Sequence, residues 1–248
     1  AVTSSSATLG IIIPPSIPMI LYAVMADASV VQIFVAGIIP GILGGGGMMG
    51  LAYWYARRYN YPVEEVFSLA RLKQTFRDAA WAFLLPLIIL GGIFGGWVTA
   101  TEGAGLAVLA ALFIGGVIYS ELDVRHLYNS MMEGAIQTAV VMLLVATSAL
   151  LGVYLTEQQI PQKLALWLSS ITSDKYAVLA ILNVFFLIIG LFLHSAAAII
   201  LVVPIVMPLV NAVGIDPVHF GLVVTLNLGI GQQTPPVASV LMTSCSIA

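Results

Sequence analysis

Charge is what this 248-residue sequence has least of, because only 8% of its residues are acidic or basic. In soluble domains roughly a quarter of the residues are charged. Hydrophobic residues make up 60% of the chain, and its mean hydropathy is +1.08. This composition excludes an ordinary soluble domain and predicts an all-α polytopic protein embedded in the lipid bilayer. The net charge of −3 is too small to indicate a nucleic-acid partner.

Cysteine and histidine are also scarce. The single Cys245 excludes a disulfide framework, and its apolar surroundings predict a small buried hydrophobic side chain. The three histidines, His126, His194 and His219, are far apart in the sequence, and no pair of acids lies deep in an apolar run. An intramembrane enzyme needs a nucleophile and base, or a set of metal ligands, at mid-depth. The sequence therefore does not favour an enzyme.

The two ends of the sequence show neither an initiator methionine nor a signal peptide. Ala1 opens inside a serine-rich run, and Ala248 closes inside an apolar one. We therefore expect this chain to be a piece of a longer protein.

Long runs without charge recur along the chain, and a membrane-spanning helix needs roughly 20 such residues. These runs are 28–56, 79–101, 103–120, 134–153, 176–215 and 217–248, of which the last two hold one histidine each. Five of the eight basic residues fall between the first two runs: Arg57, Arg58, Arg71, Lys73 and Arg77. The positive-inside rule predicts that this loop is cytoplasmic. Residues 154–175 are then external, and Ile160, Leu164, Leu168 and Ile171 predict an amphipathic helix in the interface there.

Residues 177–191 and 196–212 form two short apolar arms without a charged loop between them. The link contains His194 and Ser195. A re-entrant hairpin that turns at mid-membrane fits this pattern, because such a turn is tolerated where it is buried in protein or lines a wet cavity. The alternative is an ordinary helix with a buried histidine.

One motif occurs near both ends of the sequence. Gly10 is followed four residues later by Pro14-Pro15, and Gly231 is followed at the same spacing by Pro235-Pro236. Glycine and proline interrupt helices, so we predict breaks at Thr3–Pro15 and Gly229–Pro236. Half-helices are expected at 16–25, at 217–228 and from 237 onward. The topology gives the two broken helices opposite directions, which is typical of the inverted repeats of secondary transporters.

Helix breaks at membrane depth leave carbonyl oxygens without intrahelical donors. Unwound carbonyls and nearby hydroxyls form a natural site for Na⁺. Half-helix N-termini there also suit an anionic substrate. The alternative is that the prolines only kink packed helices while the hydroxyls bond back to carbonyls. The side chains offered by the first break are Thr3, Ser4, Ser5, Ser6 and Thr8, and those offered by the second are Asn227, Gln232, Gln233 and Thr234.

Two further features have structural interpretations. Thr99–Glu102 separates two apolar runs, and the topology favours a surface turn over a partly buried polar site. The four glycines 44–47 are explained more simply by close helix packing than by ligand contact. Asn183 is a candidate for a hydrogen bond between helices.

Several motifs in the same order resemble the large membrane subunit, the DctM-like subunit, of tripartite ATP-independent periplasmic (TRAP) transporters. The resemblance covers essentially the whole chain. It is carried by Ser4–Gly10 with Pro14–Met19, Leu90–Ile93 with Thr99–Glu102, Gly214–Gly221, and Asn227–Gly231 with Thr234-Pro235-Pro236.

This resemblance implies an elevator-type inverted-repeat transporter of the bacterial inner membrane, driven by sodium as the coupling ion and without another cofactor. A periplasmic substrate-binding protein delivers a small organic anion, a carboxylate or sugar acid, and a small four-helix membrane subunit braces the scaffold. The mobile domain would comprise 1–56 and 176–248, with the scaffold and arm at 57–175. The alternatives are an ion-coupled transporter of another inverted-repeat family, working without a binding protein, and a non-transporting structural subunit.

The resemblance also implies which residues form the site. Sodium ligands would come from the two breaks, at Ser4, Ser5, Ser6, Thr8, Gly10, Gly229, Gly231, Thr234 and Pro235. Substrate contacts would come from Ser5, His194, Ser195, Asn227, Gln232 and Gln233. Two features depart from the family pattern: many relatives have an acidic residue or Asp-Pro where this chain has His194-Ser195, and Gln232-Gln233 replaces apolar residues.

Overall fold

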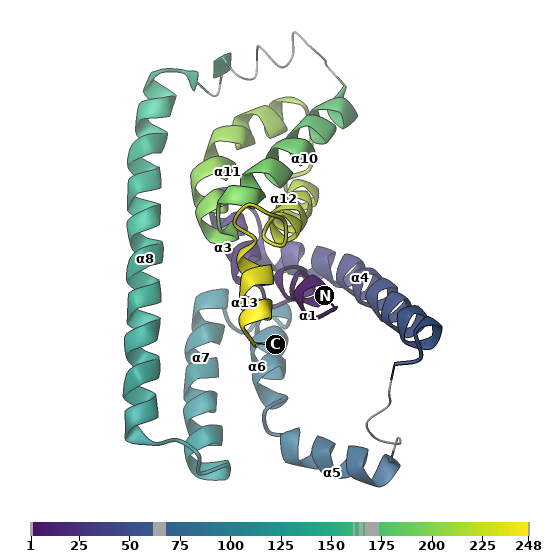
Figure 1. Cartoon of the computed structure of the whole chain (residues 1–248). Helices are drawn as coiled ribbons and strands as arrows, with labels where there is room; N and C mark the ends of the chain where they lie inside the picture. Colours follow the sequence, from purple (N-terminus) through teal and green to yellow (C-terminus); the bar gives the residue numbers. More distant parts are fainter. Residues whose placement is uncertain (1, 62–67, 161, 164–165, 167–173, 248) are drawn as a thin grey trace. The chain divides into compact units, whose positions relative to one another are not determined.

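The computed structural model describes residues 2–61, 68–160, 162–163, 166 and 174–247. Every regular element in these residues is helical (Figure 1). In chain order the elements are α1 (Val2–Ala7), α2 (Leu9–Ile12), α3 (Ile17–Met25), α4 (Val30–Arg58), α5 (Leu69–Ala79), α6 (Leu84–Phe94), α7 (Ala100–Phe113), the π-helical turn η1 (Ile114–Ile118), α8 (Val124–Glu157), α10 (Lys175–Phe192), α11 (Ser195–Ala212), α12 (Pro217–Gly231) and α13 (Ser239–Ile247).

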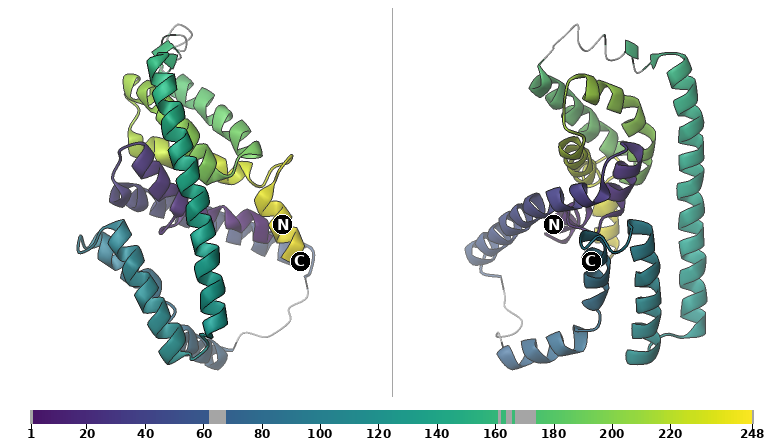
Figure 2. Two further views of the ribbon diagram at one scale, coloured as in Figure 1. Left: turned by 90° about the vertical axis from the view of Figure 1, so that its left-hand side faces the viewer. Right: turned by 180° about the vertical axis from the view of Figure 1, so that it is seen from behind.

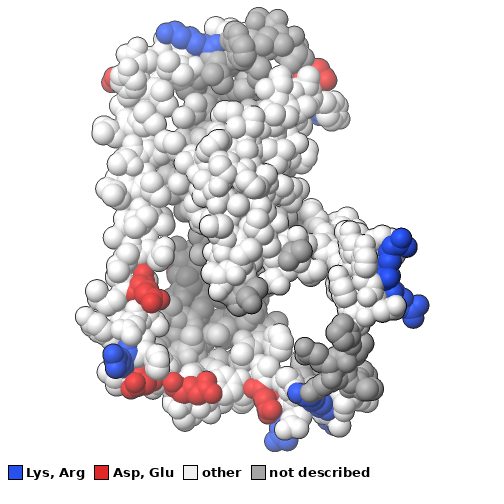
Figure 3. All heavy atoms as spheres, in the orientation of Figure 1, with Lys and Arg blue, Asp and Glu red and all other residues white. Residues whose placement is uncertain are grey.

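Five of the described helical segments are long and apolar enough to cross a membrane: α4, α7 with η1, α8, α10 and α11. Two further pairs of helices qualify together but are bent, by 40° between α2 and α3 and by 62° between α5 and α6. The prediction of an all-α polytopic membrane protein is thus confirmed. Most of the visible surface is uncharged, as a chain surrounded largely by lipid requires (Figure 3).

The helix limits differ from the predicted runs at two places. The run 79–101 is not one helix: it includes the last residue of α5, then α6, and the first two residues of α7 after a turn in which Gly96 has φ +69°. The run 134–153 is part of the much longer α8, which continues without interruption in both views of Figure 2. Polar residues extend α8 at both ends, because a helix needs apolar residues only where it contacts lipid. Of the expected interfacial helix, Leu164, Leu168 and Ile171 lie outside the described residues.

The chain divides into two compact units, residues 1–49 with 137–248 and residues 50–136. In the second unit, Thr99 caps α7: its backbone N–H donates to the Glu102 carboxylate over 2.8 Å, and the Glu102 N–H donates to the Thr99 hydroxyl. Glu102 is exposed, in agreement with the surface-turn interpretation. The division into a mobile domain and a scaffold stays a prediction.

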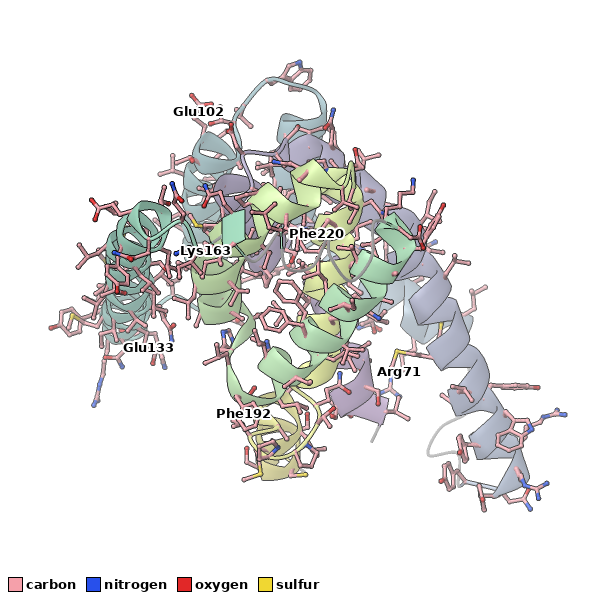
Figure 4. The ribbon with its side chains drawn as sticks, turned by 90° about the horizontal axis from the view of Figure 1, so that it is seen from above. Arg71, Glu102, Glu133, Lys163, Phe192 and Phe220 are labelled. Carbon is pink, nitrogen blue, oxygen red and sulfur yellow. The ribbon has the colours of Figure 1, made fainter. Side chains whose placement is uncertain are left out.

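The core of the first unit is mostly aliphatic, with an aromatic cluster where α3, α10 and α12 meet. Phe220 of α12 packs edge-on against Tyr22 of α3 and Phe186 of α10, with ring centroids 6.4 and 5.9 Å apart. All three side chains are fully buried, and Figure 4 shows Phe220 among the ribbons of these helices. The Tyr22 hydroxyl donates to the Pro217 carbonyl over 2.7 Å. This core holds the two proline-containing segments together.

Glycines bring α4 against the first proline motif. A Cβ atom on Gly37 would lie 2.6 Å from the Ile12 carbonyl oxygen, and one on Gly41 would lie 2.6 Å from Ile13 Cγ1. Gly44 approaches Leu9 in the same way, so helix packing accounts for the first of the four consecutive glycines. Gly46 and Gly47 have no such neighbour among the described residues. Cys245 is exposed rather than buried, which corrects the expectation from its apolar surroundings.

Candidate transport site at the two helix breaks

The first break comprises Ile13–Ser16, between α2 and α3. Its Pro14–Pro15 bond is cis, and Ser16 begins α3 by accepting from the Met19 N–H. The predicted break, Thr3–Pro15, was too long, because Ser4–Ser6 are helical. The hydroxyl of Ser6 donates to the Thr3 carbonyl over 3.0 Å. A serine that bonds back in this way satisfies itself inside a helix, so a polar run does not require unwinding.

The second break comprises residues 232–238, between α12 and α13. Its Pro235–Pro236 bond is also cis. The Thr234 hydroxyl donates to the Ile230 carbonyl over 3.1 Å, and the Val240 N–H donates to the Gln232 carbonyl over 3.2 Å. The prediction placed the break at Gly229–Pro236, whereas Gly229 and Gly231 lie in α12.

These glycines serve helix packing instead of unwinding. A Cβ atom on Gly231 would lie 2.6 Å from the Gly190 Cα of α10, and one on Gly229 would lie 2.9 Å from the Thr8 methyl carbon. Gly10, which holds the same place in the first motif as Gly231 in the second, has no neighbour this close.

Gln233 joins the second break to the helical segment that precedes the first break. Its side-chain amide donates to the Thr8 hydroxyl and, over 3.4 Å, to the Ser5 carbonyl. Thr8 is buried, and both contacts cross more than 220 residues of sequence. The structure thus brings together the motifs from the two ends of the chain.

The turn between α10 and α11 lies beside the second break. His194 caps α11 by accepting from the Ala196 N–H over 3.4 Å, and Ser195 is 2% exposed. Figure 4 shows Phe192 next to the yellow ribbon that follows α12. Two cavities of about 270 and 360 Å³ share His194, Gln232 and Ser239 in their walls. The smaller cavity is otherwise lined mainly by apolar residues of the turn, and the larger one also by Thr243 and Ser244.

Two groups of residues differ from the sequence interpretation. Asn227 lies inside α12, and its side-chain amide donates to Asn183 of α10, so it joins two helices instead of facing a cavity. Ser239, Thr243 and Ser244 were missed, although their spacing places them near one another on a helix. The hydroxyls of Thr243 and Ser244 donate to carbonyls one turn earlier, over 2.9 and 2.8 Å.

Among the described residues that line the two cavities there is no lysine, arginine, aspartate or glutamate, and His194 is the one titratable residue. Among the residues that the structure describes, no cluster of three or more His, Cys, Asp or Glu is suited to a metal ion. Oxygen donors in this region are therefore carbonyls, hydroxyls and amides. Such ligands suit a hard cation such as Na⁺ rather than a transition metal.

Paired proline-broken helices that meet inside an all-helical membrane protein are the architecture of a secondary transporter. The comparison with known families agrees. The family "Tripartite ATP-independent periplasmic transporter, DctM component" matches residues 1–248, and the chain belongs to this family. It is accordingly a multi-pass protein of the bacterial inner membrane and a transporter component, not an enzyme.

Relatives with curated names support the same assignment. The chain is 38% identical to the isethionate TRAP transporter permease protein DctMQ of Oleidesulfovibrio alaskensis, over 100% of this chain and 39% of the relative. It is 36% identical to the sialic acid TRAP transporter large permease protein SiaM of Vibrio cholerae, over 96% of this chain and 56% of the relative. Identity to the C4-dicarboxylate TRAP transporter large permease protein DctM of Pseudomonas aeruginosa is 35%, over 99% of this chain and 58% of the relative. The chain thus spans between 39% and 58% of the length of these three relatives.

Proposed function

We propose that this chain forms part of a sodium-coupled importer of a small organic anion. A periplasmic binding protein delivers the anion, and a small membrane subunit braces the permease. Membership of the DctM family supports the binding-protein-dependent class, and the names of three relatives specify isethionate, sialic acid and C4-dicarboxylate, all of them organic acids.

The contact of Gln233 with Ser5 and Thr8 is the observation that carries the sodium coupling. It joins the second break to two residues that precede the first break, the Ser5 carbonyl in α1 and the Thr8 hydroxyl between α1 and α2. Ser5, Thr8 and Thr234 would supply oxygen ligands to the ion from both sides of this contact. A cation bound there would stabilise the arrangement in which the two segments touch, and this would link sodium binding to the geometry of the neighbouring cavities.

The substrate would occupy the cavities beside the second break. The 18-residue helix α11 begins at Ser195, directly after His194 of the cavity lining, and its N-terminus favours a negative charge. Since none of the described residues that line either cavity is basic, the sodium ion would also help to balance the charge of the substrate. In the elevator mechanism, residues 1–56 and 176–248 would carry ion and anion together past the scaffold at 57–175.

Uptake into proteoliposomes tests this function. The intact permease is reconstituted with its small subunit and supplied with its loaded binding protein, under either an inward sodium gradient or an equal potassium gradient. We expect accumulation of the anion with sodium and at most a few per cent of that rate with potassium. Equal uptake in both salts would contradict the sodium coupling.

A further inference from the structure

Gln232 has a buried side-chain amide without a hydrogen-bond partner. Only 4% of the residue is exposed, and its Nε2 atom finds no acceptor in the part of the chain that the structure describes. A buried donor that stays unpaired costs about 1.4 kcal/mol or more, equivalent to tenfold in an equilibrium constant. Native proteins seldom retain such a group without a reason.

The backbone of Gln232 is fully engaged, so the unpaired amide is not a sign of a loose segment. Its N–H donates to the Leu228 carbonyl over 3.1 Å, and its carbonyl accepts from the Val240 N–H. The neighbouring Gln233 donates its own side-chain amide to Thr8 and Ser5. The two adjacent glutamines therefore differ: the amide of Gln233 has partners in the first motif, whereas the amide of Gln232 has none among the described residues.

Gln232 lines both cavities together with His194 and Ser239. The smaller cavity is lined by the apolar Leu191, Phe192 and Val237 and by the polar His194, Gln232 and Ser239. This lining suits a molecule with a short carbon skeleton and an oxygen-rich acidic group. The helix α11 begins directly after His194, so its N-terminus lies next to the cavity lining.

We propose that Gln232 determines substrate specificity: its side-chain N–H donates to a carboxylate or sulfonate oxygen of the transported anion, beside the N-terminus of α11. This inference rests on the proposed function and adds to it a residue, an atom and a ligand group. A neutral donor also explains how the site holds an anion and still releases it, because none of the described lining residues carries a fixed positive charge.

Gln232→Met tests the proposal, because methionine has a similar length and lacks the donor. Sodium-driven uptake of isethionate, sialic acid and succinate is measured in turn, each with its cognate binding protein at saturating concentration where one is required. For the anion that the wild type transports best, we expect the concentration for half-maximal uptake to rise about tenfold or more in Gln232→Met. Gln232→Glu should raise it further, because a carboxylate replaces the donor and repels the anion.

Thermal unfolding of the same purified variants separates this role from a structural one. Removing an unpaired buried donor does not cost stability, so the midpoint of Gln232→Met should equal or exceed that of the wild type. Gln158→Met, in the exposed turn directly after α8, is the matched control and should change neither measurement.

Each other outcome has a defined meaning. Sodium-dependent uptake with an unchanged half-maximal concentration in Gln232→Met overturns the role of Gln232 and leaves the proposed function intact. A lower unfolding midpoint of Gln232→Met with unchanged uptake also overturns the role of Gln232, because it shows that the amide has a partner within the protein. Wild-type uptake of none of the three acids overturns the substrate class, and uptake that ignores sodium overturns the proposed function itself.

Discussion

The two proline breaks share a spacing but differ in what fills it. Between glycine and prolines, the first has Ile11-Ile12-Ile13 and the second has Gln232-Gln233-Thr234. Ile12 is buried with its carbonyl against Gly37, and Ile13 packs on Gly41 of α4. Of the two glutamines, Gln233 instead contacts Thr8, which precedes the first break, and Gln232 lines the cavities. The first proline motif is thus held by apolar packing, whereas the second presents polar side chains at the same positions.

This difference indicates that inverted symmetry of the motif does not mean equal roles. The first break is short, four residues, and is packed against a glycine-lined helix. The second is longer, seven residues, and lies beside the turn between α10 and α11. We therefore expect substitutions in the first break to affect mainly stability, and those in the second to affect mainly transport.

The matched glycines should show the largest difference. Gly231→Ala places a methyl group 2.6 Å from the Gly190 backbone, which cannot rotate away, and should lower stability by about 2–3 kcal/mol. Gly10→Ala meets no described atom within 4 Å and should be neutral or stabilising by up to about 1 kcal/mol. Thermal unfolding in detergent measures both. Equal losses in the two variants would show that the motifs are packed alike.

Exchanging the residues at one matched position should separate stability from transport. Ile12→Gln buries an amide in an apolar contact and should cost about 2 kcal/mol of stability. Gln233→Ile removes the bridge to Ser5 and Thr8 and should impair sodium-driven uptake more than it lowers the unfolding midpoint. Normal uptake by a folded Gln233→Ile protein would argue against any coupling through this contact.

Asn227 and Ser6, four positions before Gly231 and Gly10, also differ: one bonds a residue of another helix and the other bonds its own helix. Asn227→Ala removes a buried amide that bonds Asn183 and should cost about 1 kcal/mol, as is typical of polar contacts between membrane helices. Ser6→Ala removes a hydroxyl that bonds its own helix and should change stability by only a few tenths of a kcal/mol. A double-mutant cycle with Asn183→Ala checks the assignment, and additive losses would exclude the contact between the two helices.

The smallest effects are expected from variants that remove a single side-chain hydroxyl at the proposed ion site. Ser5→Ala and Thr234→Ala should each raise the sodium concentration for half-maximal uptake by about threefold to tenfold, with little change in the unfolding midpoint. Ser246→Ala, on the exposed face of α13, serves as the control. If neither variant changes its sodium dependence, neither hydroxyl binds the ion, and backbone carbonyls or residues at other positions hold it.

The helical membrane fold and the pairing of the breaks were predictable, because lack of charge and paired prolines are strong local signals. The limits of the breaks were not. Ser4, Ser5 and Ser6 looked like a polar loop, but hydroxyls in a helix can bond to carbonyls one turn earlier, and composition does not reveal this choice. Gly229 and Gly231 looked like helix breakers, although a glycine is tolerated in a helix where another backbone approaches closely.

The candidate site was predictable in part for the same reason. Gln232, Gln233 and His194 stood out as polar residues in apolar runs, whereas the separate tasks of the two glutamines depend on side-chain directions fixed only by the folded chain. Asn227 also stood out, but its partner Asn183 lies on another helix. Ser239 was overlooked because a serine after a proline break has an ordinary structural explanation.

Sodium-specific stabilisation is the most direct test of the claim that the joined breaks bind the coupling ion. The unfolding midpoint of the purified permease is measured while sodium replaces potassium at constant ionic strength. A ligand that binds only the folded state raises stability with the logarithm of its concentration above its dissociation constant. We predict a midpoint that rises with sodium in the wild type and rises less in Thr234→Ala. A midpoint that is independent of which of the two cations is present would contradict the account.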